Sequence, residues 1–140
     1  MPRHRKLLPY AGGKSHLTAK LLRRVPEHAC YVEVFGGGGA LLAAKERSRT
    51  EVFNDLDERL VTLFRVAKHH PEALQLEAGM MLRARAEYDA FRDQPGLTDV
   101  QRAGRYLFLL VNTFGNSTQL QSFGTTTGRK HRWYGRSRRS

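Results

Sequence analysis

Short apolar runs alternate with turn residues in the first half of the chain, a pattern typical of alternating strands and helices. Residues 29–35 form an apolar run rich in β-branched and aromatic residues, which predicts a buried strand. Four glycines at 36–39 end this run, and the apolar residues from 40 onward predict a helix to about Arg47. Residues 50–53 predict a second strand, so the segment forms a βαβ unit with parallel strands. The helix that follows is predicted to bury Leu60, Leu63, Phe64 and Ala67.

A helix is also predicted before this unit. It begins at Ser15, a suitable capping residue, and runs to about residue 24. Leu17, Leu21 and Val25 recur at intervals of four residues and form one apolar stripe. Pro26 ends the helix, because proline cannot continue it.

The second half of the chain has no strand pattern and predicts helices. Pro71 suits the first position of a helix that is expected to reach Arg92. A Gln-Pro-Gly break follows, and a capping box formed by Thr98 and Gln101 begins another helix. The predicted buried residues of these helices are Leu74, Met81, Tyr88, Phe91, Tyr106, Leu107, Leu110 and Val111. We expect residues 69–127 to form a helical region beside the βαβ unit.

Two polar segments close the chain. Residues 114–127 form a Gly-rich loop whose two phenylalanines can contact bases and phosphates or can attach the loop to the core. Residues 128–140 are basic and are expected to be disordered without a partner. They hold six of the 24 lysines and arginines, so the net charge of +11 falls to +5 without them. The excess favours a nucleic acid as partner over a merely solvated basic surface.

Cysteine usage and hydropathy predict a cytoplasmic protein. Cys30 has no second cysteine to pair with, and its apolar setting predicts a small core residue in a reducing compartment. No apolar run reaches the roughly 18 residues of a membrane span, and residues 1–6 lead into no signal-peptide core. We expect no metal, because His69 and His70 point apart on a helix and no other ligands stand at suitable spacing.

The glycine turn at 36–39 is the leading candidate for a binding site. Glycines permit positive φ and close approach, and the next helix directs its free N–H groups to the same point. Nucleotide-like cofactors bind at such turns, although plain loops also contain glycine runs. Asp55 lies nineteen residues after Gly36, where an acid that holds ribose hydroxyls is expected. Asp57 suits helix capping better than Asp55 does.

The Gly-Gly-Lys-Ser segment at 12–15 superficially matches a phosphate-binding P-loop. That motif needs a further glycine at position 8, which is Leu8, and no strand precedes the segment. The segment instead places Tyr10 and Lys14 on either side of a flexible turn. Lys14 can alternatively be an exposed charge near a helix start.

Three segments together, Leu8–Ser15 (LPYAGGKS), Tyr31–Ala40 (YVEVFGGGGA) and Asn54–Asp57 (NDLD), resemble the D12-class (Dam-like) adenine-N6 DNA methyltransferases of bacteria and phages. The family pattern is P-Y/W-x-G-G-K, then E-P-F-x-G-x-G, then N-D-L or A-D-I, in this order and spacing. The resemblance covers residues 7–66 strongly and about 100–124 weakly. It implies a Rossmann-like α/β methyltransferase fold, here with an incomplete parallel sheet, and a helical DNA-recognition insertion.

The resemblance also implies a cofactor, S-adenosyl-methionine, and a partner, double-stranded DNA. The implied cofactor-binding residues are Tyr10, Lys14, Phe35, Gly36, Gly37, Gly38, Gly39 and Asp55. DNA recognition is expected after about residue 68. Candidate DNA-binding residues in the loop and tail are Asn116, Ser117, Arg129, Lys130 and Arg132. Val34 departs from the family pattern, which usually has proline there.

A larger departure is the absence of the D/N-P-P-aromatic segment with which such enzymes hold a flipped adenine. The five prolines lie at positions 2, 9, 26, 71 and 95, and no two are adjacent. We therefore assign no catalytic residue and expect an N-terminal part of the enzyme, inactive unless a second polypeptide supplies the rest. The alternatives are a non-catalytic DNA-binding remnant and a dinucleotide-dependent oxidoreductase, in which the segment from Tyr10 to Lys14 would have no role.

Overall fold

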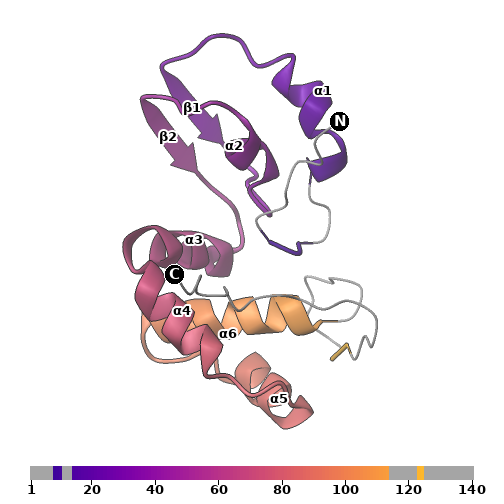
Figure 1. Ribbon diagram of the computed structural model, residues 1–140, viewed down its shortest axis with the longest axis vertical. Helices are drawn as coiled ribbons and strands as arrows, with labels where there is room; N and C mark the ends of the chain where they lie inside the picture. The colour runs from indigo at the N-terminus through magenta and orange to yellow at the C-terminus, as the bar shows by residue number, and fades with distance from the viewer. Residues whose placement is uncertain (1–7, 11–13, 114–122, 125–140) are drawn as a thin grey trace, which may run out of the picture.

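The computed structural model describes residues 8–10, 14–113 and 123–124, apart from the side chain of Ser15. Figure 1 shows a small α/β unit above a helical region. The elements in chain order are η1 (Lys14–His16), α1 (Thr18–Leu22), β1 (Cys30–Glu33), α2 (Ala40–Ala44), β2 (Thr50–Phe53), α3 (Glu58–His69), α4 (Pro71–Gly79), α5 (Arg85–Asp93) and α6 (Asp99–Asn112).

The two strands are parallel, as the βαβ prediction requires, and α2 connects them. Their register pairs Cys30 with Thr50 and Glu33 with Phe53. The ladder continues past the strand ends, because the Asn54 N–H donates to the Glu33 carbonyl at 2.8 Å. The described residues thus have a mixed α/β fold whose sheet has two strands, and β2 has its predicted bounds.

The prediction of a buried strand over residues 29–35 is wrong in its extent: the strand covers only Cys30–Glu33, and Glu33 is its one buried residue. Val32 is 52% exposed, Phe35 is 67% exposed, and Cys30 is exposed rather than a core residue. Side chains alternate between the two faces of a strand, and α2 covers only the face that carries Glu33. Parallel sheets are usually covered on both faces. Among the described residues nothing buries the other face, where Val32 lies beside Val52.

The predicted N-terminal helix is shorter than expected. A 3₁₀ turn, η1, replaces its beginning, and α1 starts only at Thr18. Leu17 is 52% exposed, so the predicted apolar stripe is only partly buried. Helix α2 likewise ends at Ala44, because Lys45 adopts an extended backbone and donates hydrogen bonds to Ser48 and the Glu46 carbonyl.

The single helix predicted from Pro71 to Arg92 is two helices, α4 and α5, with a break at residues 80–84. Both pack on α6, and Leu74 of α4 and Tyr88 of α5 are buried there. A Cβ on Gly104 of α6 would lie 2.7 Å from Glu77 Cγ, which shows how closely α4 approaches α6. One straight helix could not bury both Leu74 and Tyr88 against α6. Packing on α6 therefore overrides the apolar periodicity that predicted a single helix.

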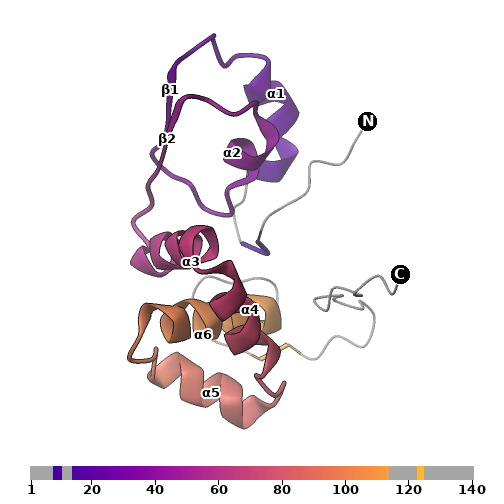
Figure 2. The same ribbon diagram turned by 60° about the vertical axis from the view of Figure 1, so that its left-hand side comes forward.

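The hydrophobic core lies in the helical region, around α6. Figure 2 shows α3 between the sheet and α6, with α5 on the far side of α6. The predicted capping box begins α6: Thr98 Oγ1 accepts from the Gln101 N–H at 3.2 Å, and Gln101 Oε1 accepts from the Thr98 N–H at 3.4 Å. On α3, Val66 is buried where Ala67 was predicted. The buried core residues are Leu8, Leu60, Leu63, Val66, Leu74, Tyr88, Ala103, Tyr106, Phe108, Leu109 and Leu110.

The described residues 8–10, 14–113 and 123–124 contain no helix that is both long and apolar enough to cross a bilayer. They also contain no group of three or more His, Cys, Asp or Glu side chains that could hold a metal ion.

Candidate functional site

The glycine turn between β1 and α2 has a geometry that requires glycine. Gly37 has a φ of +51°, in the left-handed region that favours glycine. A Cβ on Gly36 would overlap the ring of Phe53, so a side chain at this position requires that ring or the turn to move. The Gly39 N–H donates to the Gly36 carbonyl at 3.0 Å and closes the turn.

The N-terminal segment lies against this turn. A Cβ on Gly38 would be 3.3 Å from both the Leu8 carbonyl oxygen and Tyr10 Cβ. The position of a Cβ on Gly37 is 3.5 Å from the ring of Tyr10. Because Leu8 belongs to the helical core, the segment is anchored on one side and presents Tyr10 to the turn on the other. The turn therefore has an aromatic wall.

Asp55 lies directly beside the turn, and both of its carboxylate oxygens already accept backbone hydrogen bonds. Oδ2 accepts from the Gly37 N–H at 2.8 Å, and Oδ1 accepts from the Asp57 N–H at 2.9 Å. Each carboxylate oxygen can accept a second hydrogen bond. Asp55 thus fixes the shape of the turn while keeping the capacity to accept hydrogen bonds from hydroxyl groups.

Lys14 reaches the opposite side of the turn as a paired charge. Its Nζ donates to Glu33 Oε1 at 2.8 Å and to the Phe35 carbonyl at 2.6 Å. Glu33 is only 3% exposed, and its other oxygen accepts from the Leu42 N–H at 3.1 Å, in the first turn of α2. A buried carboxylate needs such partners. Lys14 and Glu33 together tie η1, β1 and α2 to one point.

Sequence reasoning missed Glu33 and Asn54 as residues that build the site. Glu33 is the one acid inside an apolar run, and a charge in such a place signals a buried partner. Asn54 donates from Nδ2 to the Val34 carbonyl at 3.0 Å, and its own carbonyl accepts from the Gly36 N–H at 2.9 Å. Neither contact depends on a proline at position 34, so the substitution by valine is compatible with the turn.

Asp57 caps α3, as its sequence position predicts. Its Oδ1 accepts from the backbone N–H of Arg59 at 3.1 Å, and the Arg59 guanidinium donates to both carboxylate oxygens at 2.8 and 2.9 Å. Oδ2 also accepts from the Tyr106 hydroxyl at 2.7 Å. Asp57 therefore joins the start of α3 to the middle of α6.

Charge and burial around Asp57 shift several pKa values. Burial alone would raise the pKa of Asp57, but hydrogen bonds from Arg59 and Tyr106 outweigh it and lower the pKa below its usual range. Burial, followed by the hydrogen bond to Asp57, raises the pKa of Tyr106. Burial and the negative charges of Asp57 and Asp55 raise the pKa of Tyr10. The hydroxyls of both tyrosines thus stay protonated near neutral pH.

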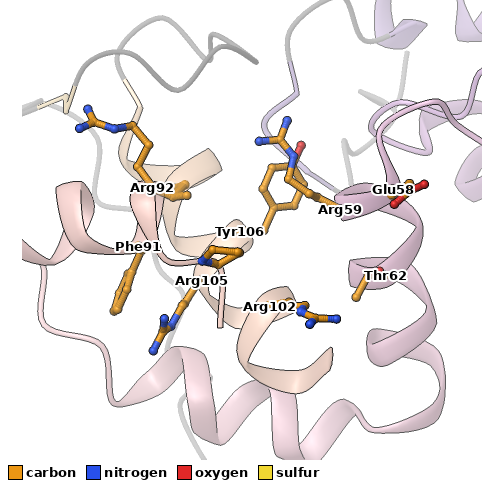
Figure 3. A pocket seen from close by; sticks show the side chains of 10 residues that line it. Glu58, Arg59, Thr62, Phe91, Arg92, Arg102, Arg105 and Tyr106 are labelled. Atoms are coloured by element: carbon orange, nitrogen blue, oxygen red, sulfur yellow. The ribbon is translucent and has the colours of Figure 1, made fainter. Parts of the chain in front are cut away.

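An open pocket of about 410 Å³ lies beside this group, between α3, α5 and α6 (Figure 3). Its guanidinium groups point in different directions in Figure 3 rather than toward one centre. Arg59, Arg92 and Arg102 each pair with an aspartate. The pocket is therefore no ready-made anion site. Its lining residues are Glu58, Arg59, Thr62, Phe91, Arg92, Pro95, Arg102, Arg105, Tyr106 and Leu109.

The candidate DNA-binding residues Asn116, Ser117, Arg129, Lys130 and Arg132 lie outside the described residues. One phenylalanine of the predicted loop is described. The ring of Phe123 lies 5.4 Å from that of Tyr88, centroid to centroid, and the guanidinium of Arg85 lies 5.8 Å from the Phe123 ring. This contact favours the interpretation in which Phe123 attaches the loop to the core.

Comparison with known proteins identifies the class to which this mixed α/β chain belongs. The sequence model of the D12 class N6 adenine-specific DNA methyltransferase family matches residues 10–136. The chain therefore belongs to this family.

Individual relatives agree with the family assignment. A DNA adenine methylase of Escherichia coli (strain K12) is 26% identical over 119 residues, which cover 82% of this chain and 42% of that protein. A DNA adenine methylase of Salmonella typhi is 29% identical over 128 residues, which again cover 82% of this chain and 42% of that protein. The chain thus spans less than half the length of the curated relatives it matches.

Proposed function

We propose that this chain forms the methyl-donor-binding part of a DNA adenine-N6 methyltransferase that uses S-adenosyl-methionine. The observation that carries the proposal is the convergence of Tyr10, Gly37 and Asp55 on one turn. These residues come from three separate segments of the sequence. The family assignment supports a methyl donor as the ligand. The turn combines an approachable glycine backbone, an aromatic ring and a carboxylate, which are the features that a nucleoside ligand needs.

Each predicted cofactor residue can be given a role in this proposal. The rings of Tyr10 and Phe35 would pack against the donor, and Phe35 is exposed enough to do so. The glycines at 36–39 would let the donor approach the backbone. Asp55 would accept hydrogen bonds from the ribose hydroxyls with its remaining lone pairs. Lys14 keeps a third N–H beyond the two it uses, and that group would face the donor.

We further propose a division of labour along the chain. Residues 1–68 would be the N-terminal part of a Rossmann-like cofactor domain, and residues 69–127 would recognise double-stranded DNA. The basic residues 128–140 would add electrostatic attraction to the DNA backbone. Within the last two segments, the DNA-contacting residues would be Asn116, Ser117, Arg129, Lys130 and Arg132.

Methyl transfer requires more than this chain supplies. In such a transfer the exocyclic amine of the flipped adenine would attack the donor methyl group, the S–CH3 bond would break to release S-adenosyl-homocysteine, and the amine would lose a proton. Acceptors would have to take hydrogen bonds from that amine so that its lone pair is free. Without the D/N-P-P-aromatic segment, the chain alone would bind the donor without transferring the methyl group. Additional polypeptide would supply the segment, and the open face at Val32 and Val52 offers it a place to pack.

Calorimetric titration of the chain with S-adenosyl-methionine tests the proposal. We expect saturable binding that is strongly weakened in Asp55→Ala. Asp99→Asn is a matched control, because that carboxylate is exposed and pairs with Arg65 at the start of α6, away from the turn. Absence of binding by a folded chain would refute the proposal. Preference for NAD over the methyl donor would favour the oxidoreductase alternative instead.

A further inference from the structure

A series of hydrogen bonds, linked at Asp57 through that residue's own backbone and side chain, runs from the glycine turn into the helical region. The Gly37 N–H donates to Asp55, whose other oxygen accepts from the Asp57 N–H. The Asp57 carboxylate in turn accepts from the hydroxyl of Tyr106, 49 residues away in the sequence. The three links measure 2.8, 2.9 and 2.7 Å, so each is a well-formed hydrogen bond. The helical region thus contacts the candidate cofactor site through one side chain of α6.

Tyr106 is held firmly at the end of this series. It is 3% exposed, and a buried hydroxyl of this kind needs a hydrogen-bond partner. The guanidinium of Arg59 lies over its ring, 4.7 Å from the centroid (Figure 3). The same guanidinium also binds the Asp57 carboxylate. Arg59 is about half exposed, so solvent weakens its hold on Asp57. Tyr106 is therefore the buried partner that fixes the Asp57 carboxylate.

We propose that Tyr106 is a positioning residue for the methyl-donor site. Its hydroxyl holds the Asp57 side chain, and the backbone N–H of the same residue holds the Asp55 carboxylate in the position that shapes the turn at Gly37. This inference rests on the proposed function, since it concerns the same site. It also predicts reciprocity: any contact that displaces Tyr106 weakens donor binding, and bound donor strengthens the contact between Tyr106 and Asp57.

The test compares Tyr106→Phe with Tyr88→Phe in the full chain. Both substitutions remove one buried hydroxyl and keep the ring. The Tyr88 hydroxyl bonds to Thr113 Oγ1 at 2.7 Å, wholly within the helical region, so it controls for loss of a buried hydrogen bond. Two readouts are needed: the dissociation constant for S-adenosyl-methionine, and the hydrogen exchange of the Gly37 amide without donor, each corrected for global stability.

For Tyr106→Phe we expect donor affinity to fall by about 3- to 30-fold, as for residues that share one hydrogen-bond network. We also expect faster exchange at the Gly37 amide, because Asp55 holds that N–H less firmly. Tyr88→Phe should change neither value after the correction for stability.

The two readouts separate failure of this inference from failure of the proposed function. If the unmodified chain binds no donor, the proposed function fails, and Gly37 exchange still decides whether Tyr106 positions the turn. If Tyr106→Phe and Tyr88→Phe leave Gly37 equally protected, Tyr106 is only a structural residue and the inference is overturned. Normal donor affinity in Tyr106→Phe would overturn it as well.

Discussion

The α/β unit and the helical region are stabilised by different means. Around α6 the helical region buries a continuous core in which Leu60, Tyr88 and Ala103 are fully enclosed. In the α/β unit, Val32, Phe35 and Val52 remain exposed, and polar contacts of Glu33, Asp55 and Asp57 join its segments. The candidate site therefore lies where a polar network joins a small sheet to an apolar helical core.

The difference explains why the site lies at this border. Hydrogen bonds fix positions and orientations, but each contributes only about 1 kcal/mol net to stability. The helical core supplies the stability, and its residues Leu8 and Tyr106 connect it to the polar groups of the candidate site.

Core truncation should produce the largest effect. Leu110→Ala should lower the free energy of unfolding by about 2–5 kcal/mol, because Leu110 is 1% exposed and the truncation leaves a cavity. Val32→Ala, on the open face of the sheet, should change it by no more than about 0.5 kcal/mol. Chemical denaturation of both variants measures the contrast. Similar losses would show that the sheet is buried in solution.

Adding a methyl group at the glycine turn should have the next largest effect. Gly36→Ala places a Cβ against the Phe53 ring, so the ring or the turn must shift, at a cost of about 1–3 kcal/mol, and donor binding should be weakened. Gly79→Ala is the control, because within the part of the chain that the structure describes no atom other than its chain neighbours and its own helix backbone lies within 4 Å of the added Cβ. That variant should keep donor binding and unfold at the same or a slightly higher temperature. Undiminished donor binding by Gly36→Ala would contradict the tight turn.

Loss of the helix cap should have a smaller effect. Thr98→Ala removes the hydroxyl that accepts from the Gln101 N–H, which should cost about 1 kcal/mol of stability. Thr98→Ser keeps the hydroxyl and should cost less. Thermal melts of the two variants distinguish the cap from general effects at this position. Equal melting temperatures would mean that the cap contributes nothing measurable.

Elements that depend on residues close together in the sequence were predicted correctly. The bounds of β2, the Asp57 cap and the capping box at Thr98 each depend on residues within a few positions of one another. The sequence also placed Gly37 and Asp55 in one candidate site, and the structure brings them together. Their roles toward a cofactor remain proposals.

Features that depend on distant packing could not be predicted in this way. Whether Val32 is buried depends on what covers the sheet, which periodicity does not reveal. The break between α4 and α5 follows from packing on α6. The contact between Lys14 and Glu33 spans 19 residues, and that between Asp57 and Tyr106 spans 49. The sequence can signal that a residue such as Glu33 has a buried partner, but only the fold shows which residue that partner is.

The smallest predicted effect is a pH dependence centred on Asp57. Its pKa is lower in the folded chain than in the unfolded chain, so the folded state binds its proton less readily. This contribution to stability is fully present above the unfolded pKa, about 3.9, and is lost as pH falls through the lower folded value. Asp57→Asn removes it while keeping a capping residue. Urea denaturation should therefore show a stability difference between the two proteins that is constant above about pH 5 and shrinks toward pH 3. A difference independent of pH would show that the charge of Asp57 does not hold Arg59 and Tyr106 in place.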